Sequence, residues 1–298
     1  MKLSVILLCL ALAPGAGAAP SALVIQTDFG TKDGAVAAMK GVAFGIAPQL
    51  PIFDLSQENT PYDIWEGAYR LKQTVPYWPA GTVFVSVIDP GVGTARASVV
   101  LKTKAGQYFV GPDNGTWTLV AEEGGIEAVR RIDEKANRRP GSEKSYTFHG
   151  RDVYVYTGAR LAAGLITFEQ VGPLLPPEVI RLPYQHAARE GAGVEGAIPV
   201  IDFHYGNIWT NISDELFEGL HPRFGQKFLV VIQRDGREIY RGTLPYARTF
   251  GDVPVGQPLL YLNSLLNVAF ALNQGSFAEK YGLSAGGGWS THLTPAGP

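Results

Sequence analysis

The stretch GTVFVSVIDPGVG, residues 81–93, does most to decide the fold of this chain. Residues 82–88 are apolar or β-branched apart from Ser86, which is typical of a buried strand. Asp89 and a loop rich in glycine and proline follow at once, so the strand ends where polar turn residues begin. A buried strand of this kind needs cover on its faces, which favours a sheet packed against helices.

The segments around this strand alternate between strand and helix patterns. The expected strands lie at 21–30, 51–55, 98–103 and 107–115, and the expected helices at 35–44, 62–74 and 153–163. Asp63, just after Pro61, stands near the start of the second helix, where an acidic residue is favoured. This alternation predicts an N-terminal α/β domain with a central, mostly parallel or mixed sheet.

The second half of the chain has a different composition. A Pro- and Gly/Ala-rich piece at 174–197 is followed by short alternating strands, and Asp235-Gly236 is expected to form a hairpin turn. We therefore predict an α/β domain over 19–183, a linker over 184–196 and a smaller all-β domain over 197–298. The charged segment EKANRRPGSEK, residues 134–144, is expected to be an exposed loop.

The N-terminus has the pattern of a secretory signal peptide. Lys2 precedes a short apolar run from Leu3 to Leu12, and Ala16-Gly17-Ala18 offers a cleavage site. The run is shorter than the roughly 20 residues of a membrane anchor, so residues 1–18 are expected to be removed, leaving an exported, periplasmic or secreted protein. Cys9 lies inside this run, so the mature chain has no disulfide. The alternatives are a lipoprotein anchor at Cys9 and a buried N-terminal strand.

Several classes of function lack their sequence signals here. The formal net charge is −2, with no basic stretch interleaved with aromatics, so no nucleic-acid partner is expected, and no membrane association after signal cleavage. There is no G-x-G-x-x-G, no G-x-x-x-x-G-K-[ST] and no G-x-S-x-G motif. The histidines are not spaced as zinc ligands, so no metal site is expected.

Polar clusters stand where expected strands give way to loops, which is where ligands bind in open α/β sheets. These clusters are Thr27–Gly30, Asp89–Gly93, Pro112–Gly115 and Asp202–Asn207. Each could be only a turn, since Asp, Asn and Gly form turns for local reasons. His149, one of five histidines, stands with Arg151 and Asp152 at what reads as the start of a strand or helix.

Seven motifs, taken in order along the chain, are similar to those of the S-adenosylmethionine (SAM) hydroxide adenosyltransferase family, whose halogenating relatives are the fluorinase and chlorinase. The motifs are TDFGTKDG, NTPYDIWEGAYRL, VIDPGVGT, GPDNGTW, TFHGRDVY, IDFHYGNIWTNI and YLNS. The resemblance covers about residues 23–280. It implies a two-domain homotrimer whose sites lie between subunits, a displacement of L-methionine from C5′ of SAM by water, and no cofactor besides the substrate.

The resemblance also implies a catalytic set. Asp63, Arg70 and His149 match the residues held responsible for water activation, with His149 holding and deprotonating the water. Val92 and Gly150 stand where the halogenases have halide-binding Thr and Ser, so a hydrolase and not a halogenase is expected. The chemistry agrees, because a base that titrates near neutrality and a permanent cation can together stabilise developing hydroxide. On the residues alone, Asp63 and Arg70 could be a surface pair and His149 a core histidine.

The implied substrate contacts divide by chemical type. Asp28 would accept from the ribose hydroxyls, with Tyr62 packing nearby and Phe148 and Phe250 flanking the adenosine. The other expected binding residues are polar: Asn207 at the adenine edge, Asp202 and Ser264 at the methionine end, and Asp89 and Asn263. The halogenases follow the matching Ser with Arg, whereas this chain has Leu265, so recognition of the methionine carboxylate departs from their pattern.

Export conflicts with this activity, because SAM is made and used in the cytoplasm. The alternative is an exported adenosine- or nucleoside-binding protein on the same scaffold, without turnover. Such a protein would keep Asp28, Asn207 and the aromatics but would not need the catalytic set. A structural trimeric envelope protein would need neither.

Overall fold

The computed structural model describes residues 21–297. The expected signal peptide and Cys9 lie outside the described residues. The first part of the chain contains β1 (Leu23–Thr27), α1 (Ala35–Ile46), β2 (Ile52–Ser56), α2 (Ile64–Thr74), η1 (Val75–Tyr77), β3 (Val83–Val87), β4 (Ser98–Thr103), β5 (Tyr108–Pro112), α3 (Thr118–Glu123), β6 (Ile126–Arg131), α4 (Glu134–Asn137), η2 (Gly150–Tyr154), α5 (Val155–Ala162), η3 (Glu169–Val171) and β7 (Leu174–Leu175). The second contains β8 (Ala188–Glu190), β9 (Gly193–Ala197), β10 (Val200–Ile201), β11 (Ile208–Ser213), α6 (Asp214–Glu218), β12 (Lys227–Arg234), β13 (Arg237–Pro245), η4 (Phe250–Asp252), β14 (Pro258–Leu262), β15 (Asn267–Leu272), α7 (Phe277–Tyr281) and β16 (Trp289–Pro295).

The first part is built on one seven-stranded mixed sheet in the order β2-β1-β3-β5-β4-β6-β7. The strands β2, β1, β3 and β5 run parallel, while β4, β6 and β7 pair antiparallel. Strand β3 lies between β1 and β5 and is buried along its whole length. The expected mixed α/β sheet is confirmed, and its parallel strands bring their carboxyl ends to one edge.

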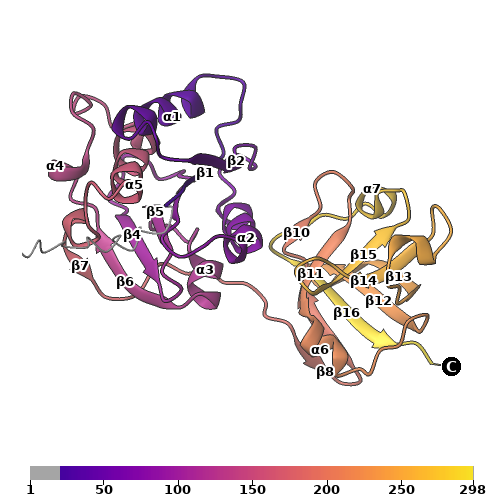
Figure 1. The fold of residues 1–298 in the computed structure, drawn as a ribbon. Helices are drawn as coiled ribbons and strands as arrows, with labels where there is room; N and C mark the ends of the chain where they lie inside the picture. The colour runs from indigo at the N-terminus through magenta and orange to yellow at the C-terminus, as the bar shows by residue number, and fades with distance from the viewer. Residues whose placement is uncertain (1–20, 298) are drawn as a thin grey trace, which may run out of the picture.

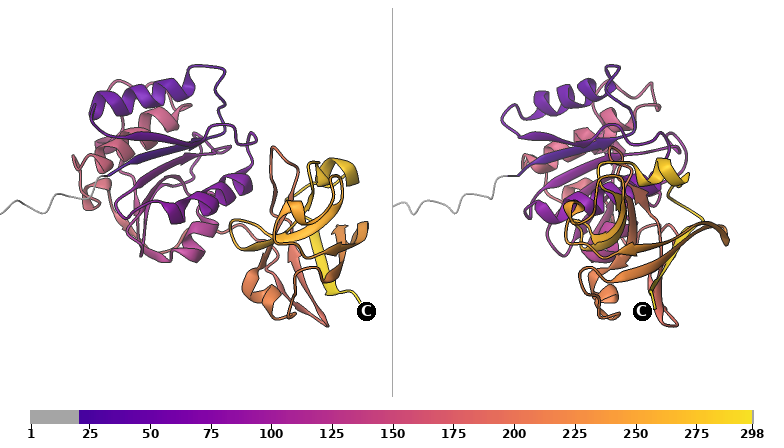
Figure 2. Two further views of the ribbon diagram at one scale, coloured as in Figure 1. Left: turned by 45° about the vertical axis from the view of Figure 1, so that its right-hand side comes forward. Right: turned by 90° about the vertical axis from the view of Figure 1, so that its right-hand side faces the viewer.

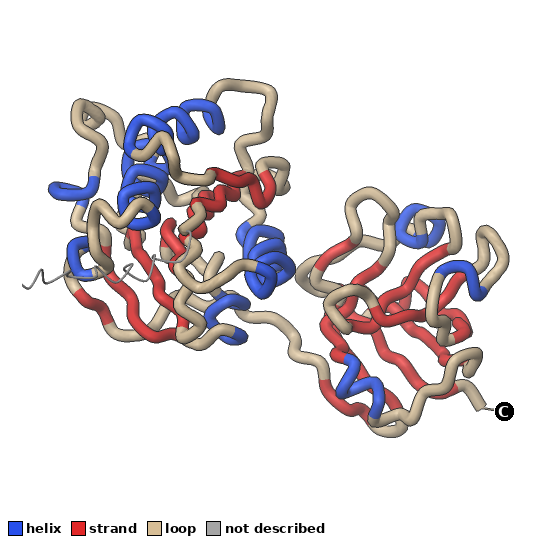
Figure 3. The backbone as a smooth tube through the Cα atoms, in the orientation of Figure 1, coloured by secondary structure: helices blue, strands red, loops and turns tan. Residues whose placement is uncertain are grey.

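Helices cover both faces of this sheet (Figures 1 and 3). On one face, α1 and α5 pack side by side, with Met39, Val155 and Ala159 in the core beneath them. On the other face, Leu71 of α2 and Val120 of α3 pack against Phe84 of β3. Helix α2 begins as the sequence predicts, because Asp63 is its N-cap and accepts from the Glu66 N–H.

The second part contains a four-stranded sheet, β10-β11-β15-β14, and a five-stranded sheet, β13-β12-β16-β9-β8. All recorded pairings within these two sheets are antiparallel, and the sheets share one hydrophobic core. Along the chain, the short helix α6 follows β11 and the short helix α7 follows β15, so this part is mainly but not entirely β. Asp235 and Gly236 join β12 to β13 with φ of 50° and 78°, which confirms the hairpin turn.

Two expected irregular segments contain regular structure. Within the expected loop 134–144, residues 134–137 form α4, and Asn137 and Ser142 are buried. Just before it, β6 pairs with β4 along the sheet, although its sequence is charged. The exposed-loop prediction was therefore wrong for residues 134–137, which form a helical turn, and for the two buried side chains, whereas residues 138–144 have no regular secondary structure. The expected linker 184–196 likewise includes β8 and the start of β9.

The two parts meet through α2 and the segment around β10 (Figure 2). The Trp65 Nε1 donates to the Pro199 carbonyl over 3.1 Å, and the Trp65 ring lies 4.9 Å from that of Tyr184. Ala68 and Tyr69 of α2 share a hydrophobic cluster with Trp209. Within residues 21–297, no helix is both long and apolar enough to cross a membrane.

Candidate functional site

Polar residues gather at the edge where the parallel strands of the large sheet end. Asp28 follows β1 directly, and its Oδ2 accepts from the Tyr62 backbone N–H over 2.8 Å. Tyr62 has a φ of 68°, in the left-handed region that residues other than glycine seldom adopt, and its ring is 73% exposed. The Asp28 hydrogen bond therefore supports a strained turn that presents an aromatic ring to solvent.

Asp89, which follows β3, already has a strong partner. Arg96 donates to both of its carboxylate oxygens, through Nε to Oδ1 over 2.8 Å and through Nη2 to Oδ2. Both side chains are largely buried, at 4% exposure for Asp89 and 10% for Arg96. Arg96 continues to the Ser98 hydroxyl, which contacts the Tyr154 hydroxyl. Asp89, expected to bind substrate, is thus placed in a buried ion pair at this edge.

Asp63 and Arg70 both lie on α2 but do not contact each other directly. The Asp63 Oδ1 accepts from the Glu66 N–H over 2.9 Å, and Arg70 donates to Glu66 Oε1 over 3.3 Å and to Gln73 Oε1 over 3.2 Å. Glu66 therefore lies between them, and its Oε2 also accepts from the Thr60 N–H. The structure links two members of the expected catalytic set through one further carboxylate, which the sequence analysis did not identify.

His149 stands immediately before η2 and is 5% exposed. Its Nε2 lies 3.4 Å from Arg138 Nη2 and 3.9 Å from Glu134 Oε1, and its buried Nδ1 has no hydrogen-bond partner within residues 21–297. Burial lowers the pKa of His149, and the charges of Arg96 and Arg138 lower it further, against the opposing effect of Glu134. No hydrogen bond or ion pair among the described residues joins His149 to Asp63 or Arg70.

Phe148, next to His149, lies partly buried beside the strand ends. Its ring meets that of Phe29 edge-on at 5.8 Å, and the Arg151 guanidinium stacks over it at 4.8 Å. Gly150 follows in an apolar setting: a Cβ there would lie 3.4 Å from Met39 Sδ, Phe29 and Val87, at ordinary van der Waals distance. The backbone at this position therefore packs against these three side chains.

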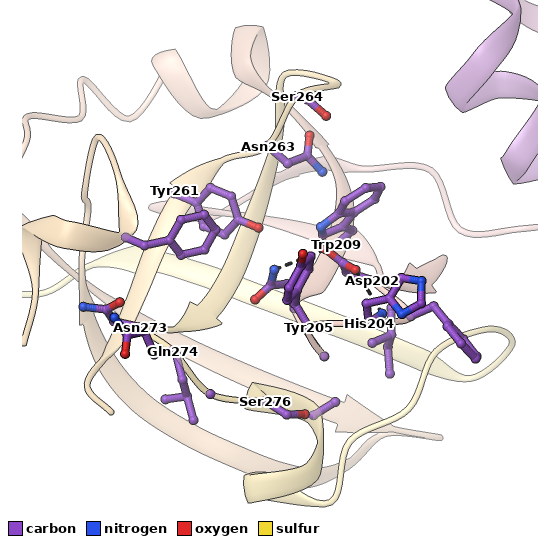
Figure 4. A pocket seen from close by; sticks show the side chains of 18 of the residues that line it. Asp202, His204, Tyr205, Trp209, Tyr261, Asn263, Ser264, Asn273, Gln274 and Ser276 are labelled. Carbon is purple, nitrogen blue, oxygen red and sulfur yellow. Dashed lines mark hydrogen bonds between the residues drawn. The ribbon is translucent and has the colours of Figure 1, made fainter. Parts of the chain in front are cut away.

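A pocket of about 1030 Å³ lies in the second part of the chain, lined by residues between Ile201 and Glu279 (Figure 4). Its lining includes the five expected substrate-binding residues that lie in the second part of the chain: Asp202, Asn207, Phe250, Asn263 and Ser264. The pocket also includes residues that the sequence analysis did not select: Trp209, Arg248, Tyr261, Asn273, Gln274 and Ser276. They come from β11, β14 and the turns after β13 and β15, so only the sheet pairing brings them together.

The loop 202–207 forms one wall of this pocket. The Asp202 carboxylate accepts from the Asn207 Nδ2 over 3.3 Å and from the His204 N–H over 3.3 Å, and Asn207 is 4% exposed. The Phe250 ring packs 5.0 Å from that of Tyr261, whose pKa is raised to about 12, chiefly by burial. The pocket thus offers amide and carboxylate groups beside aromatic rings, which suits a heteroaromatic ligand with polar edges.

The expected site residues therefore form two groups. Asp28, Tyr62, Asp63, Asp89, Phe148 and His149 lie on the first part of the chain, and none of them lines the pocket of the second. Within residues 21–297 no cluster of three or more His, Cys, Asp or Glu side chains is arranged to hold a metal ion.

Comparisons with known proteins place these observations in a family. The model described as SAM hydroxide adenosyltransferase N-terminal domain matches residues 23–172, and the corresponding C-terminal domain model matches residues 196–290. The chain is 36% identical over 262 residues to an (R)-S-adenosyl-L-methionine hydrolase of Salinispora tropica, covering 87% of this chain and 93% of the relative.

Two further relatives extend the comparison. A fluorinase of an Actinoplanes species is 32% identical over 289 residues, covering 89% of this chain and 95% of the fluorinase. A crystal structure of an uncharacterized conserved protein from Thermotoga maritima superposes with a TM-score of 0.84 at 32% identity, covering 91% of this chain and 99% of that one.

Proposed function

The chain belongs to the SAM hydroxide adenosyltransferase family, and on that premise we propose that it hydrolyses S-adenosyl-L-methionine to adenosine and L-methionine. The observation that carries the proposal is the likeness, over 87% of the chain, to a relative named as a hydrolase of this substrate. In the proposed step, the oxygen of water forms a bond to C5′. The C5′–S bond breaks with its electron pair going to sulfur, so methionine leaves as a neutral thioether and the water gives up one proton.

Water is proposed as the nucleophile, in preference to halide. Val92 offers no side-chain hydrogen-bond donor, and Gly150, which lies beside Met39, Phe29 and Val87, has no hydroxyl to offer one. The higher identity to the hydrolase than to the fluorinase, 36% against 32%, agrees with this choice.

Asp63, Arg70 and His149 are proposed as the residues that prepare the attacking water. Arg70 keeps its charge at any working pH and can stabilise developing negative charge on oxygen. Asp63 is exposed at the N-terminus of α2, and its second carboxylate oxygen accepts no hydrogen bond from the part of the chain that the structure describes. The reaction as proposed needs no cofactor, because the positive charge on the substrate sulfur already makes methionine a good, neutral leaving group.

Substrate binding is proposed to use both groups of residues. Asp28, Tyr62, Asp89 and Phe148 would surround the ribose and C5′, and Asp28 Oδ1, which no hydrogen bond engages within residues 21–297, would accept from a hydroxyl. The pocket of the second part would take the adenine and the methionine end, through Asn207, Phe250, Asp202, Asn263 and Ser264.

We propose that these two groups meet between subunits of a homotrimer. The support is that the expected site residues fall into two separate groups. The lining of the pocket runs from Ile201 to Glu279 and contains no residue of the first group. The exposed rings of Tyr62 on one part, and of Phe203 and Tyr205 on the other, are available for such a contact. The N-terminal residues 1–18 support export as a further proposal, on their sequence alone.

A complementation experiment tests activity and site sharing together. Asp28→Ala removes the carboxylate of the first group, and Asn207→Ala removes the amide of the second, so each variant alone is expected to form adenosine more slowly than the parent at SAM concentrations below KM. Unfolding the two variants together and refolding them as a mixture restores adenosine formation if sites combine residues from two subunits. Activity in the parent without any restoration in the mixture refutes shared sites. No adenosine from the parent, with tight adenosine binding, would identify a binding protein instead.

A further inference from the structure

The side chain of His149 lies near two arginine–tyrosine pairs. The Arg138 guanidinium stacks over the Tyr146 ring at 4.7 Å, and that ring is 6.3 Å from the imidazole. The Arg96 guanidinium stacks over the Tyr154 ring at 5.6 Å, and that ring is 6.2 Å from the imidazole. Two permanent cations thus lie near a side chain that is only 5% exposed.

Arg138 is held firmly in the position that faces Nε2. Its Nη2 donates to Glu134 Oε2 over 2.5 Å, its Nη1 donates to the Ser145 carbonyl over 3.4 Å, and its side chain is 7% exposed. The segment before His149 and the short helix α4 are therefore tied together through this one guanidinium. Because an arginine side chain is long and flexible, these two hydrogen bonds restrict its guanidinium to the position that faces His149.

The chemistry of this contact selects one form of the imidazole. A guanidinium has only donors and stays charged, so it can face an imidazole nitrogen favourably only where that nitrogen presents its lone pair. Nε2, 3.4 Å from Arg138 Nη2, is then the bare nitrogen, and the single proton of the neutral ring resides on Nδ1. The competing acceptor, Glu134 Oε1, is farther from Nε2 at 3.9 Å, and its carboxylate is already bound by Arg138.

The surrounding charges also oppose protonation of the ring. Burial comes first in lowering the pKa of His149, followed by the charge of Arg96, and Arg138 adds to the effect. Glu134 and Asp89 act in the opposite direction, but each is paired with an arginine. The imidazole is therefore neutral at neutral pH.

We infer that Arg138 is a positioning residue that holds His149 as the neutral imidazole protonated on Nδ1, so that His149 donates a hydrogen bond in the proposed reaction and does not accept the proton of water. Nδ1 is buried in the single chain, and no group within residues 21–297 engages it. A donor there can orient an enclosed water, while the proton released by the attacking water passes to a carboxylate such as Asp63 or to solvent. This inference deepens the proposed function and rests on it for its catalytic meaning.

Nitrogen NMR of protein labelled with [15N]histidine tests the tautomer directly, without any turnover. The chain has five histidines, and His149→Gln identifies the signal of His149 by its loss. At pH 7 we expect a pyrrole-type shift for Nδ1 and a pyridine-type shift for Nε2. An Nε2-protonated ring, or a doubly protonated one, overturns the inference.

Two substitutions at Arg138 separate positioning from mere packing. Arg138→Gln removes the charge that faces Nε2, so the Nδ1 tautomer is expected to lose its dominance and the titration of His149 to move upward. Arg138→Lys keeps a cation that can only donate and is expected to retain the parent tautomer. Unchanged His149 signals in a folded Arg138→Gln protein contradict the inference.

The kinetic readout uses the same variants. If His149 is a donor, kcat falls in Arg138→Gln and recovers in Arg138→Lys. In the parent, the fall of kcat with decreasing pH then does not follow the His149 titration seen by NMR. A fall that coincides with that titration identifies His149 as the base and overturns the inference. A protein without turnover, but with the expected tautomer, would sink the proposed function alone, so the two failures are distinguishable.

Discussion

Substituting Asp63 separates a structural role from a chemical one at the same carboxylate. The Asp63 Oδ1 accepts from the Glu66 N–H over 2.9 Å and so caps α2. Replacing an N-cap Asp by Ala costs about 1 kcal/mol, whereas Ser is a comparably good cap. In a domain the size of the first part of the chain, a loss of about 1 kcal/mol in the free energy of unfolding lowers the melting temperature by roughly 2–4 °C. We therefore expect this loss in Asp63→Ala and almost none in Asp63→Ser.

Activity should follow a different order from stability. If the carboxylate takes part in preparing water, both variants lose the group, and adenosine formation falls by about 10²–10⁴-fold in each, the range typical of acid–base groups. Thermal unfolding by calorimetry and adenosine formation by chromatography measure the two effects on the same samples. Ser213, the N-cap of α6, supplies the control, because Ser213→Ala should lose similar stability and keep its activity. An Asp63→Ser protein with parent-level activity would refute the chemical role and leave Asp63 as a cap only.

Three further outcomes are expected. Gly111→Ala should destabilise the protein by about 1–3 kcal/mol, because a Cβ there would lie 2.3 Å from the Ser86 carbonyl, whereas Gly41→Ala in α1, with nothing within 4 Å, should stabilise it in urea unfolding. Asn207→Ala should weaken adenosine binding about three- to tenfold in calorimetry, and an unchanged affinity would remove Asn207 from the adenine site. Because the pKa of His149 is lowered from 6.5, the unfolded chain takes up a proton that the folded protein excludes, so its contribution to stability is present above pH 6.5 and lost as pH falls below it. Urea unfolding at several pH values should accordingly show a shallower acid decline in His149→Gln, and an equal or steeper decline would contradict the pKa direction.

The sequence predicts the elements whose signals are local. The apolar run at 83–87, the Asp63 helix start and the Asp235-Gly236 turn are each decided by a few neighbouring residues, and all three are confirmed. Strand β6 was missed because its charged side chains mask backbone pairing with β4, which lies far away in the sequence. The start of η2 at His149 was ambiguous because its alternating apolar residues, which fit a strand, are buried in a helical turn.

The candidate site could be predicted as a set of residues but not as an arrangement. The five pocket residues expected from the resemblance do share one pocket, yet Trp209 and Tyr261 join it only because β11, β15 and β14 pair side by side. The ion pair of Asp89 with Arg96, and the contact of Arg138 with His149, likewise depend on the fold. Nothing in the spacing of these residues along the chain indicates that they meet.

The most direct test of the central claim is hydrolysis of SAM by the mature chain, beginning at Ala19, in water enriched in 18O. Attack of water at C5′ predicts adenosine that carries one 18O in its 5′-hydroxyl, together with methionine that gains no label, as read by mass spectrometry of the separated products. Label in methanol or homoserine would show attack at a different carbon of the sulfonium. Absence of adenosine altogether would contradict the account, whatever the protein binds.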